Sequence, residues 1–342
     1  MELLNFKTNP DSFSIHEHIE SVLLWGNPDA ISDDTLISIC IPTYKRPDLL
    51  KEALLSALGQ DTDTPYKIII GDNDPDFNNQ EVLDVVQSLN NNNILYYKHK
   101  ENLGAGGNWN RFFILANTPW VALLHDDDLL LSDYISTITG IIERHGNKFD
   151  ALANNFGFLW TTNILDRFKQ KFAKKRGSSF VIFLYDFSKK CYDAFCNIIF
   201  FYIKQKQLVR ITLADTIFLE NVHRSPTCGM IFRRESMISS GGFNISSGYS
   251  SGDWYFCIYF TEHWRFFKLK KRLGIYRFGN MNDTFTVLDK LAQEKKLCIQ
   301  SLKAHNWVCR FLINWLEKYP EGKNHSVLLQ IIKKYYFFKH YG

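Results

Sequence analysis

Four consecutive polar side chains, His125 to Asp128, directly follow the apolar run 120–124. Within them Asp126 and Asp128 form an Asp-x-Asp pair, and two such carboxylates can hold a hard divalent cation that also bridges phosphate oxygens. A cation held there stabilises the charge that builds on a departing nucleoside diphosphate. An aspartate at this place can instead cap a following helix, but a cap requires one aspartate and the run supplies three. The pattern therefore favours a metal site at Asp126 and Asp128, with Mn²⁺ or Mg²⁺ as the ion.

Two further aspartates lie in segments rich in turn-forming residues. Asp72 ends an apolar run inside Gly-Asp-Asn-Asp-Pro, where its carboxylate can accept hydrogen bonds from a ribose or a base N–H. Taken alone, this segment is better explained as ordinary turn chemistry. Asp253 stands before Trp254 after a glycine-rich loop. It is either a general base that takes a proton from an acceptor hydroxyl, with Trp254 as a platform for a sugar, or the N-cap of a helix.

The glycine-rich segment 102–108 does not have the G-x-G-x-x-G spacing of a dinucleotide site. This excludes a Rossmann-type NAD site. We expect instead a loop that approaches a nucleotide closely, with Asn108 in it and Arg111 nearby as a contact to phosphate or base. Three histidines lack the spacing of a zinc site and are expected to be ordinary surface or core residues: His125, His223 and His263.

Apolar runs alternate with helical periodicity through the first half of the chain. Strands are predicted at 36–41, 67–70, 94–98 and 120–124, and helices at 47–58, 81–89 and 109–116. This alternation predicts an α/β fold, a mostly parallel sheet with right-handed crossovers and flanking helices. Ligands bind such sheets beyond the carboxyl ends of the strands. Thr43, Asp72 and the aspartate run are therefore expected at one edge.

Composition limits the classes of function. Of the 342 residues 45% are hydrophobic and 22% are charged, which excludes a disordered chain. The net charge of +4 gives no argument for nucleic acid as a partner. Aromatic residues reach 15%, and such an excess lines a sugar-binding cleft, faces a membrane or fills the core.

The cysteines and the apolar runs bear on the compartment. Seven scattered cysteines without a C-x-x-C pair fit a reduced compartment better than a disulfide framework. The first residues do not have the pattern of a signal peptide. The apolar run 195–203 is about half as long as the roughly 20 residues that cross a bilayer. We expect a cytoplasmic protein, with a peripheral position on the inner face of the cell membrane also open.

Five segments, taken in their order and spacing, resemble the family 2 glycosyltransferases, which are inverting enzymes with the GT-A fold. The segments are 38–60, 68–74, 102–111, 123–130 and 227–253. The similarity is good over about residues 36–150 and looser over 225–285. It implies an enzyme that moves a single sugar from a nucleotide sugar, a UDP-hexose, to an acceptor hydroxyl. The implied acceptor is a lipid-linked glycan of bacterial polysaccharide, O-antigen or capsule assembly.

The resemblance implies roles for individual residues. Asp72 would contact the uracil or ribose, Asp126 and Asp127 would lie by the ribose and the donor sugar, Asp128 would hold the metal, and Asp253 would be the catalytic base. The residues that follow the first strand would line the nucleotide pocket: Pro42, Thr43, Tyr44 and Arg46.

Two family features are missing from the sequence. Family members often add a late histidine at the metal, but the segment 276–284 has none, so Asn280 or water would stand in. The Q-x-x-R-W element of processive polysaccharide synthases is also absent. Its absence favours transfer of a single sugar.

The sequence divides into five predicted parts. They are a leader at 1–35, a nucleotide-sugar-binding half at 36–150, a basic, aromatic helical insertion at 151–225, an acceptor-binding and catalytic-base half at 226–290, and a helical region at 291–342. Segment 166–210 carries eleven Lys or Arg against three Asp. Such a stretch can rest on an anionic membrane, or it can pack on the catalytic part with its cations solvated.

Two other classes of function remain open. A catalytically silent relative would bind carbohydrate or scaffold an assembly complex, but such a protein has no need of Asp72, Asp126, Asp128 and Asp253 together. A sugar nucleotidyltransferase would have a glycine-rich, basic loop after the first strand, and the residues at 41–45 do not form one.

Overall fold

The computed structural model describes residues 3–30, 34–160, 208–210, 228–245, 252–278, 297, 299–305 and 307–318. Four parallel strands form the centre of its sheet: β2 (Ile37–Thr43), β3 (Tyr66–Asp72), β4 (Ile94–His99) and β5 (Trp120–Leu123). They are buried on both faces, which explains their continuous apolar runs. The four predicted strands are confirmed with ends within two residues. The carboxyl ends of β2, β3 and β5 consequently meet at one edge.

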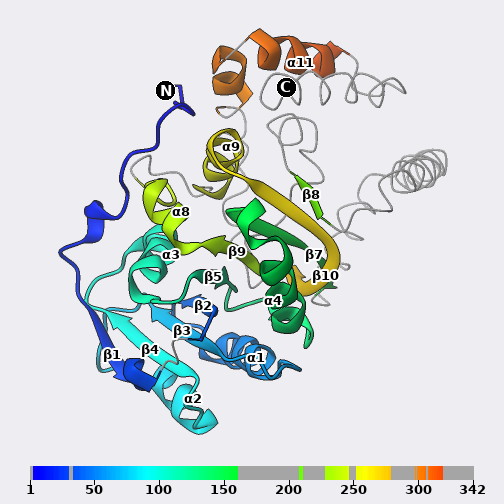
Figure 1. Cartoon of the computed structure of the whole chain (residues 1–342). Coiled ribbons are helices and arrows are strands. Elements are labelled where there is room, and N and C mark those ends of the chain that lie inside the picture. The colour runs from blue at the N-terminus through cyan, green and yellow to red at the C-terminus, as the bar shows by residue number, and fades with distance from the viewer. Residues whose placement is uncertain are drawn as a thin grey trace, which may run out of the picture.

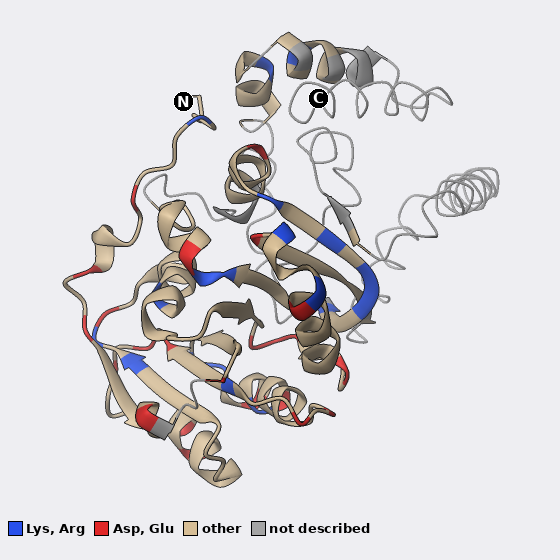
Figure 2. Cartoon of the chain, in the orientation of Figure 1, with Lys and Arg blue, Asp and Glu red and all other residues tan. Residues whose placement is uncertain are grey.

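Antiparallel pairing extends the sheet beyond β5. The added strands are β9 (Met230–Arg233), β7 (Ala151–Trp160), β10 (Phe266–Phe278), β6 (Leu129–Leu130) and β8 (Leu208–Arg210). β9 is antiparallel to β5 and β7, whereas β7 and β10 are parallel. Lys and Arg residues are spread along β10 (Figure 2). Because β10 pairs with β6 near its carboxyl end, its last residues reach the loop between β5 and β6.

Helices cover both faces of the sheet (Figure 1). One core cluster joins the sheet to α1 (Pro47–Leu58), α2 (Glu81–Leu89) and α4 (Tyr134–His145). The other face packs on α3 (Gly104–Leu115), α8 (Arg234–Ser239) and α9 (Gly252–His263). The fold is therefore α/β with a mostly parallel centre, as predicted from the sequence.

The N-terminal segment is not an irregular leader, contrary to the prediction for 1–35. It contains β1 (Ser21–Trp25), which pairs antiparallel with β4 and completes the sheet. The strand order is β1-β4-β3-β2-β5-β9-β7-β10-β6, with β8 paired to β10. All five residues of β1 are half-buried, so this edge strand lacks the alternating or fully apolar pattern that marks a strand.

The segment predicted as a glycine-rich loop is mostly helix. Gly104 has a φ of +69° and begins α3, and the following glycines allow close packing. A Cβ on Gly107 would lie 2.6 Å from His16 Nδ1, and one on Gly106 would lie 2.8 Å from Ile245 Cγ2. The glycines thus let the N-terminal segment and the chain near Ile245 approach the helix.

The prediction of a helical insertion at 151–225 is wrong where the structure can test it. Residues 151–160 and 208–210 are strands of the sheet, β7 and β8. Residues 161–207 and 211–227, which include most of the basic segment 166–210, lie outside the described residues. In the C-terminal region α11 (Trp307–Lys318) is helical as predicted. Within the described residues no helix has the length and apolar character needed to cross a membrane.

Candidate functional site

The acidic loop, residues 125–128, connects β5 to β6 at the edge where the parallel strands end. Its carboxylates are nearly inaccessible, because Asp126 is 6%, Asp127 7% and Asp128 0% exposed. Burying three carboxylates together is costly unless positive charge or hydrogen bonds compensate them. The partners of each one therefore indicate what the loop is built to hold.

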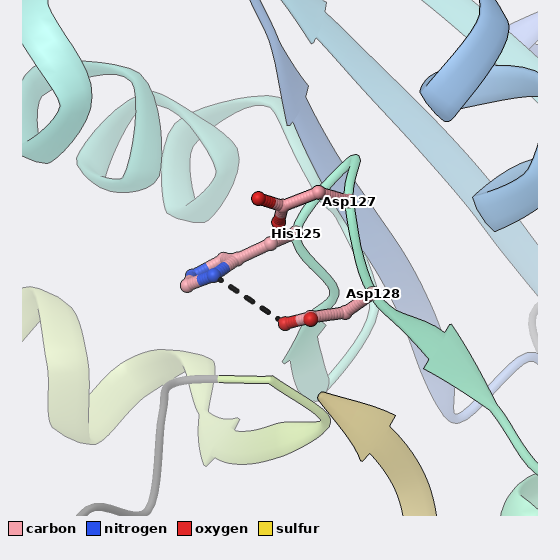
Figure 3. Close-up of side chains that lie close together, drawn as sticks. All are labelled: His125, Asp127 and Asp128. Carbon is pink, nitrogen blue, oxygen red and sulfur yellow. Dashed lines mark ion pairs between the residues drawn. The ribbon is translucent and has the colours of Figure 1, made fainter. Parts of the chain in front are cut away.

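His125, Asp127 and Asp128 turn their side chains toward one another (Figure 3). Each offers one ligand atom, and these atoms all lie within 4.8 Å of one another. His125 Nδ1 is 3.6 Å from Asp128 Oδ2 (Figure 3). This Oδ2 is fully buried and accepts no N–H or O–H hydrogen bond from the described part of the chain, although the thiol of Cys228 interacts with the Asp128 carboxyl group. A buried carboxylate oxygen left over beside an imidazole and a second carboxylate fits a divalent cation.

Ionisation of the loop is unfavourable without such a cation. Burial, followed by the charge of Asp127, raises the pKa of Asp128 to about 8. The same two causes raise the pKa of Asp126 to about 6, although Arg46 and Thr43 act in the opposite direction. Near neutral pH the loop therefore does not carry its full negative charge, and a bound cation would restore it.

Asp126 faces the end of β2 rather than the ligand cluster. Thr43 Oγ1 donates to Asp126 Oδ2 at 2.9 Å. Arg46 Nη1 lies 3.6 Å from Asp126 Oδ1 and 3.7 Å from Asp127 Oδ2. The structure thus groups Asp127 and His125 with Asp128, where the sequence had suggested Asp126 as the second ligand.

His125 was predicted to be an ordinary histidine and instead belongs to the cluster. Its ring stacks on Trp109 of α3 with centroids 5.5 Å apart and planes 12° from parallel. Trp109 in turn contacts Phe243 edge to face at 5.2 Å. The position of the imidazole is therefore fixed by a helix on the other side of the site. An imidazole directly before three carboxylates was the sequence signal for this role.

Arg277 of β10 is a second residue that the sequence did not reveal. Its backbone N–H donates to Asp128 Oδ1 at 2.9 Å, and its Nε donates to the carbonyl oxygen of Asp127 at 2.9 Å. Its guanidinium also forms an ion pair with Glu52 of α1. Arg277 thereby joins β10, the acidic loop and α1, and it holds one oxygen of Asp128 while the other stays available.

Asp72 lies at the predicted edge, paired in register with Thr43. It is 1% exposed, and burial raises its pKa. Tyr96 donates its hydroxyl to Asp72 Oδ2 at 2.8 Å, and Lys98 Nζ lies 3.6 Å from the same oxygen. The carboxylate is thus held in place from β4. Tyr44, by contrast, is 46% exposed at the same edge.

Asn108 and Arg111 have structural partners. Asn108 Nδ2 donates to the carbonyl of Gly71 at 2.8 Å, and Asn108 Oδ1 lies 3.0 Å from His99 Nε2. Arg111 donates to two backbone carbonyls of the N-terminal segment, those of residues 16 and 19. These contacts tie α3 to β3 and to the chain before β1, and they do not support the expected contact of either side chain with a nucleotide.

His99 gives the fold a defined pH dependence. Because Asn108 Oδ1 accepts, His99 Nε2 carries the proton and Nδ1 accepts from Ser21 Oγ at 2.9 Å. Burial lowers the pKa of His99 from 6.5 to about 4. A lowered histidine pKa stabilises the fold fully above the unfolded value and less as the pH falls toward the folded value. We expect His99 to remove about 2 kcal/mol from the free energy of unfolding between pH 7.5 and 5.

Urea unfolding of the parent and of His99→Gln across this pH range measures that contribution. The variant should lose less stability on acidification than the parent. His18→Gln is the matched control, because His18 is exposed, and it should keep the parental pH dependence. Parallel curves for the parent and His99→Gln would contradict the assignment.

Asp253 and Trp254 lie in the first turn of α9, as the second and third residues of the helix. As the second residue of α9, Asp253 is not the N-cap that the alternative expected. The backbone position is compatible with a general base and also with a first-turn acid that interacts with the helix dipole. Their side chains lie outside the described part of the structure.

Comparisons with known proteins agree on one family. The sequence model of the family described as Glycosyl transferase family 2 matches residues 38–234, more than half of the chain. Abequosyltransferase RfbV of Salmonella typhimurium is 34% identical over 115 residues, which are 33% of this chain and 34% of that protein. The GalNAc(5)-diNAcBac-PP-undecaprenol beta-1,3-glucosyltransferase of Campylobacter jejuni is 33% identical over 105 residues, 30% of this chain and 33% of that protein. The matched stretch spans about a third of the length of either relative.

The fold is also found among solved structures. TarS of S. aureus, residues 1–349 in complex with UDP-GlcNAc, superposes with a TM-score of 0.51 at 16% identity. The superposition covers 79% of this chain and 65% of the TarS chain. At this identity the similarity shows a shared fold.

Proposed function

Since the chain belongs to glycosyl transferase family 2, we propose that it moves a single sugar from a UDP-hexose to an acceptor hydroxyl. The proposed transfer inverts the anomeric centre and is assisted by a divalent cation. The observation that carries the proposal is the acidic loop, where a buried Asp128 oxygen that accepts no N–H or O–H hydrogen bond from the described residues faces His125 and Asp127. A structural role gives no reason to leave that oxygen without a hydrogen-bond donor. A nucleotide-sugar site gives such a reason, because the oxygen can then bind the cation.

Each side chain has a proposed task. His125, Asp127 and Asp128 hold Mn²⁺ or Mg²⁺, which when bound neutralises the charge that develops on the leaving diphosphate. Asp126 lies by the ribose and the donor sugar. The residues at the end of the parallel strands form the nucleotide pocket, as proposed from the family: Pro42, Thr43, Tyr44, Arg46 and Asp72.

Asp253 is the proposed general base, and Trp254 the proposed platform for the acceptor. The acceptor oxygen forms its bond to the anomeric carbon as the bond from that carbon to the diphosphate breaks. Asp253 takes the hydroxyl proton, and the nucleoside diphosphate leaves with the electron pair. A single displacement of this kind inverts the anomeric centre.

The acceptor is proposed to be a lipid-linked glycan at the inner face of the cell membrane. Support comes from the Campylobacter relative, whose name specifies a PP-undecaprenol acceptor. A transfer to such an acceptor would be a step in the assembly of a bacterial polysaccharide. The basic segment 166–210, which would meet an anionic surface, lies mostly outside the described residues.

Incubation of the purified chain with a panel of UDP- and GDP-sugars, with Mn²⁺ or with EDTA, tests the proposal. We expect UDP release from one UDP-hexose with Mn²⁺, faster with a lipid-linked acceptor, and background release in EDTA. Binding of a nucleotide sugar without turnover under any condition would indicate a silent carbohydrate-binding relative. Synthesis of a nucleotide sugar from UTP and a sugar 1-phosphate would indicate a nucleotidyltransferase.

A further inference from the structure

Arg46 holds a position between two kinds of partner. It is the N-cap residue of α1 and lies three residues beyond the end of β2 at Thr43, beside the proposed nucleotide pocket. Its Nη1 lies 3.6 Å from Asp126 Oδ1 and 3.7 Å from Asp127 Oδ2. Counting side-chain atoms alone, Asp126 and Asp127 are 8% and 9% exposed, whereas the Arg46 side chain is 28% exposed. A guanidinium at the rim of the site thus compensates two buried carboxylates and still has access to solvent.

The Asp127 carboxylate cannot compensate the charge of Arg46 and that of a divalent cation equally well. It belongs to the ligand cluster with His125 and Asp128, so an ion bound there is close to the guanidinium. Two positive groups that share one buried carboxylate repel each other strongly, because little water screens them. Binding of the ion alone must therefore displace Arg46 or tolerate its charge.

A nucleoside diphosphate removes this conflict. Its oxygens can accept two parallel hydrogen bonds from a guanidinium. The N-terminus of α1, whose N-cap is Arg46, favours an anion in the same place. We propose that Arg46 is the counter-ion of Asp126 and Asp127 before the donor binds, and that it transfers to the donor diphosphate when cation and donor bind together. This inference rests on the proposed function of the site.

The exchange has a thermodynamic consequence. Because Arg46 opposes the cation in the absence of donor and attracts the donor, each ligand strengthens the binding of the other, and by the same factor. Arg46 is thus the residue that couples the two binding events. Without it the cation should bind more tightly on its own and the nucleotide more weakly.

Measuring the binding of Mn²⁺ and of UDP to Arg46→Met tests these two opposite effects, tighter binding of the cation and weaker binding of the nucleotide. Free Mn²⁺ is measured by electron paramagnetic resonance without nucleotide, and UDP binding by calorimetry in EDTA and in Mn²⁺. For Arg46→Met we expect Mn²⁺ alone to bind about threefold to tenfold more tightly, UDP in EDTA about tenfold more weakly, and little coupling between them. Lys51→Met is the matched control, because it removes one exposed cation from the same helix, and it should behave as the parent.

The outcomes separate this inference from the proposed function. Unchanged or weaker Mn²⁺ binding by Arg46→Met overturns the counter-ion role. Independent binding of Mn²⁺ and UDP by the parent overturns the exchange. A parent chain that binds neither ligand overturns the proposed function itself. Arg46→Lys covers a failure of Arg46→Met to fold: it keeps the charge without the bidentate geometry, and the parental coupling factor in this variant would also contradict the exchange.

Discussion

Asp128→Asn should lower sugar transfer by at least about 100-fold at saturating Mn²⁺ while the protein stays folded. Asparagine has the shape of aspartate, and its Oδ1 can still accept the N–H of Arg277, which lies 2.9 Å from Asp128 Oδ1. What disappears is the negative charge on the buried oxygen that faces His125 and Asp127. The proposed cation then loses a ligand and the leaving diphosphate loses its stabilisation.

Stability provides an independent readout for the same variant. Burial raises the pKa of Asp128 to about 8 from its usual value of 3.8. A carboxyl group with a raised folded pKa destabilises the fold increasingly as the pH rises from the unfolded toward the folded value. Asp128→Asn cannot ionise, so in EDTA above neutral pH it should unfold at the same or a higher urea concentration than the parent.

The combination of lost transfer and retained stability identifies a functional carboxylate. Asp84→Asn on the exposed face of α2 is the matched control, and it should change neither quantity. Transfer rates, urea midpoints in EDTA and Mn²⁺ titrations of the three proteins are the required measurements. Near-parental transfer by Asp128→Asn in chelator-treated buffer would show that the cation is held elsewhere or is not needed.

The strands that position the site were predictable because strands buried on both faces appear in the sequence as short, continuous apolar runs. β2 and β3 are buried along almost their whole length, so each reads as a short apolar run closed by turn formers. β1 and β7 escaped prediction for different reasons. β1 is a half-buried edge strand. β7 is separated by two residues from a 3-10 turn (Gly146–Lys148) and has Asn154 and Asn155 in its middle.

The composition of the acidic loop was equally evident, but the partner of each carboxylate was not. Asp126 meets Thr43 and Asp128 meets Arg277, contacts that span 83 and 149 positions of the chain. Such pairings depend on the backbone path of the loop and on where β10 ends. No pattern within a few residues of the loop encodes either, so Asp-x-Asp spacing alone selected Asp126 where the geometry favours Asp127.

Replacing Asp253 should produce the second large loss of activity. If this residue takes the acceptor proton, Asp253→Asn lowers transfer by about 100-fold or more, because asparagine keeps the shape and the hydrogen bonds but cannot accept a proton. Binding of UDP and Mn²⁺ should persist, since the proposed donor contacts lie on β2, β3 and the acidic loop. Initial rates of transfer and calorimetric UDP binding measure the two effects separately.

The position of Asp253 in the first turn of α9 makes a purely structural role the alternative, and a second substitution distinguishes the two. An acid in the first turn of a helix interacts favourably with the helix dipole, and its loss costs about 0.3–1 kcal/mol. A structural Asp253 therefore predicts near-parental transfer for Asp253→Asn and a lower unfolding free energy for Asp253→Ala. A catalytic Asp253 predicts that both variants lose transfer, whatever their stability. Glu235→Gln, which changes an exposed first-turn acid of α8, should transfer sugar at the parental rate. Parental transfer by Asp253→Asn would place the base on another residue.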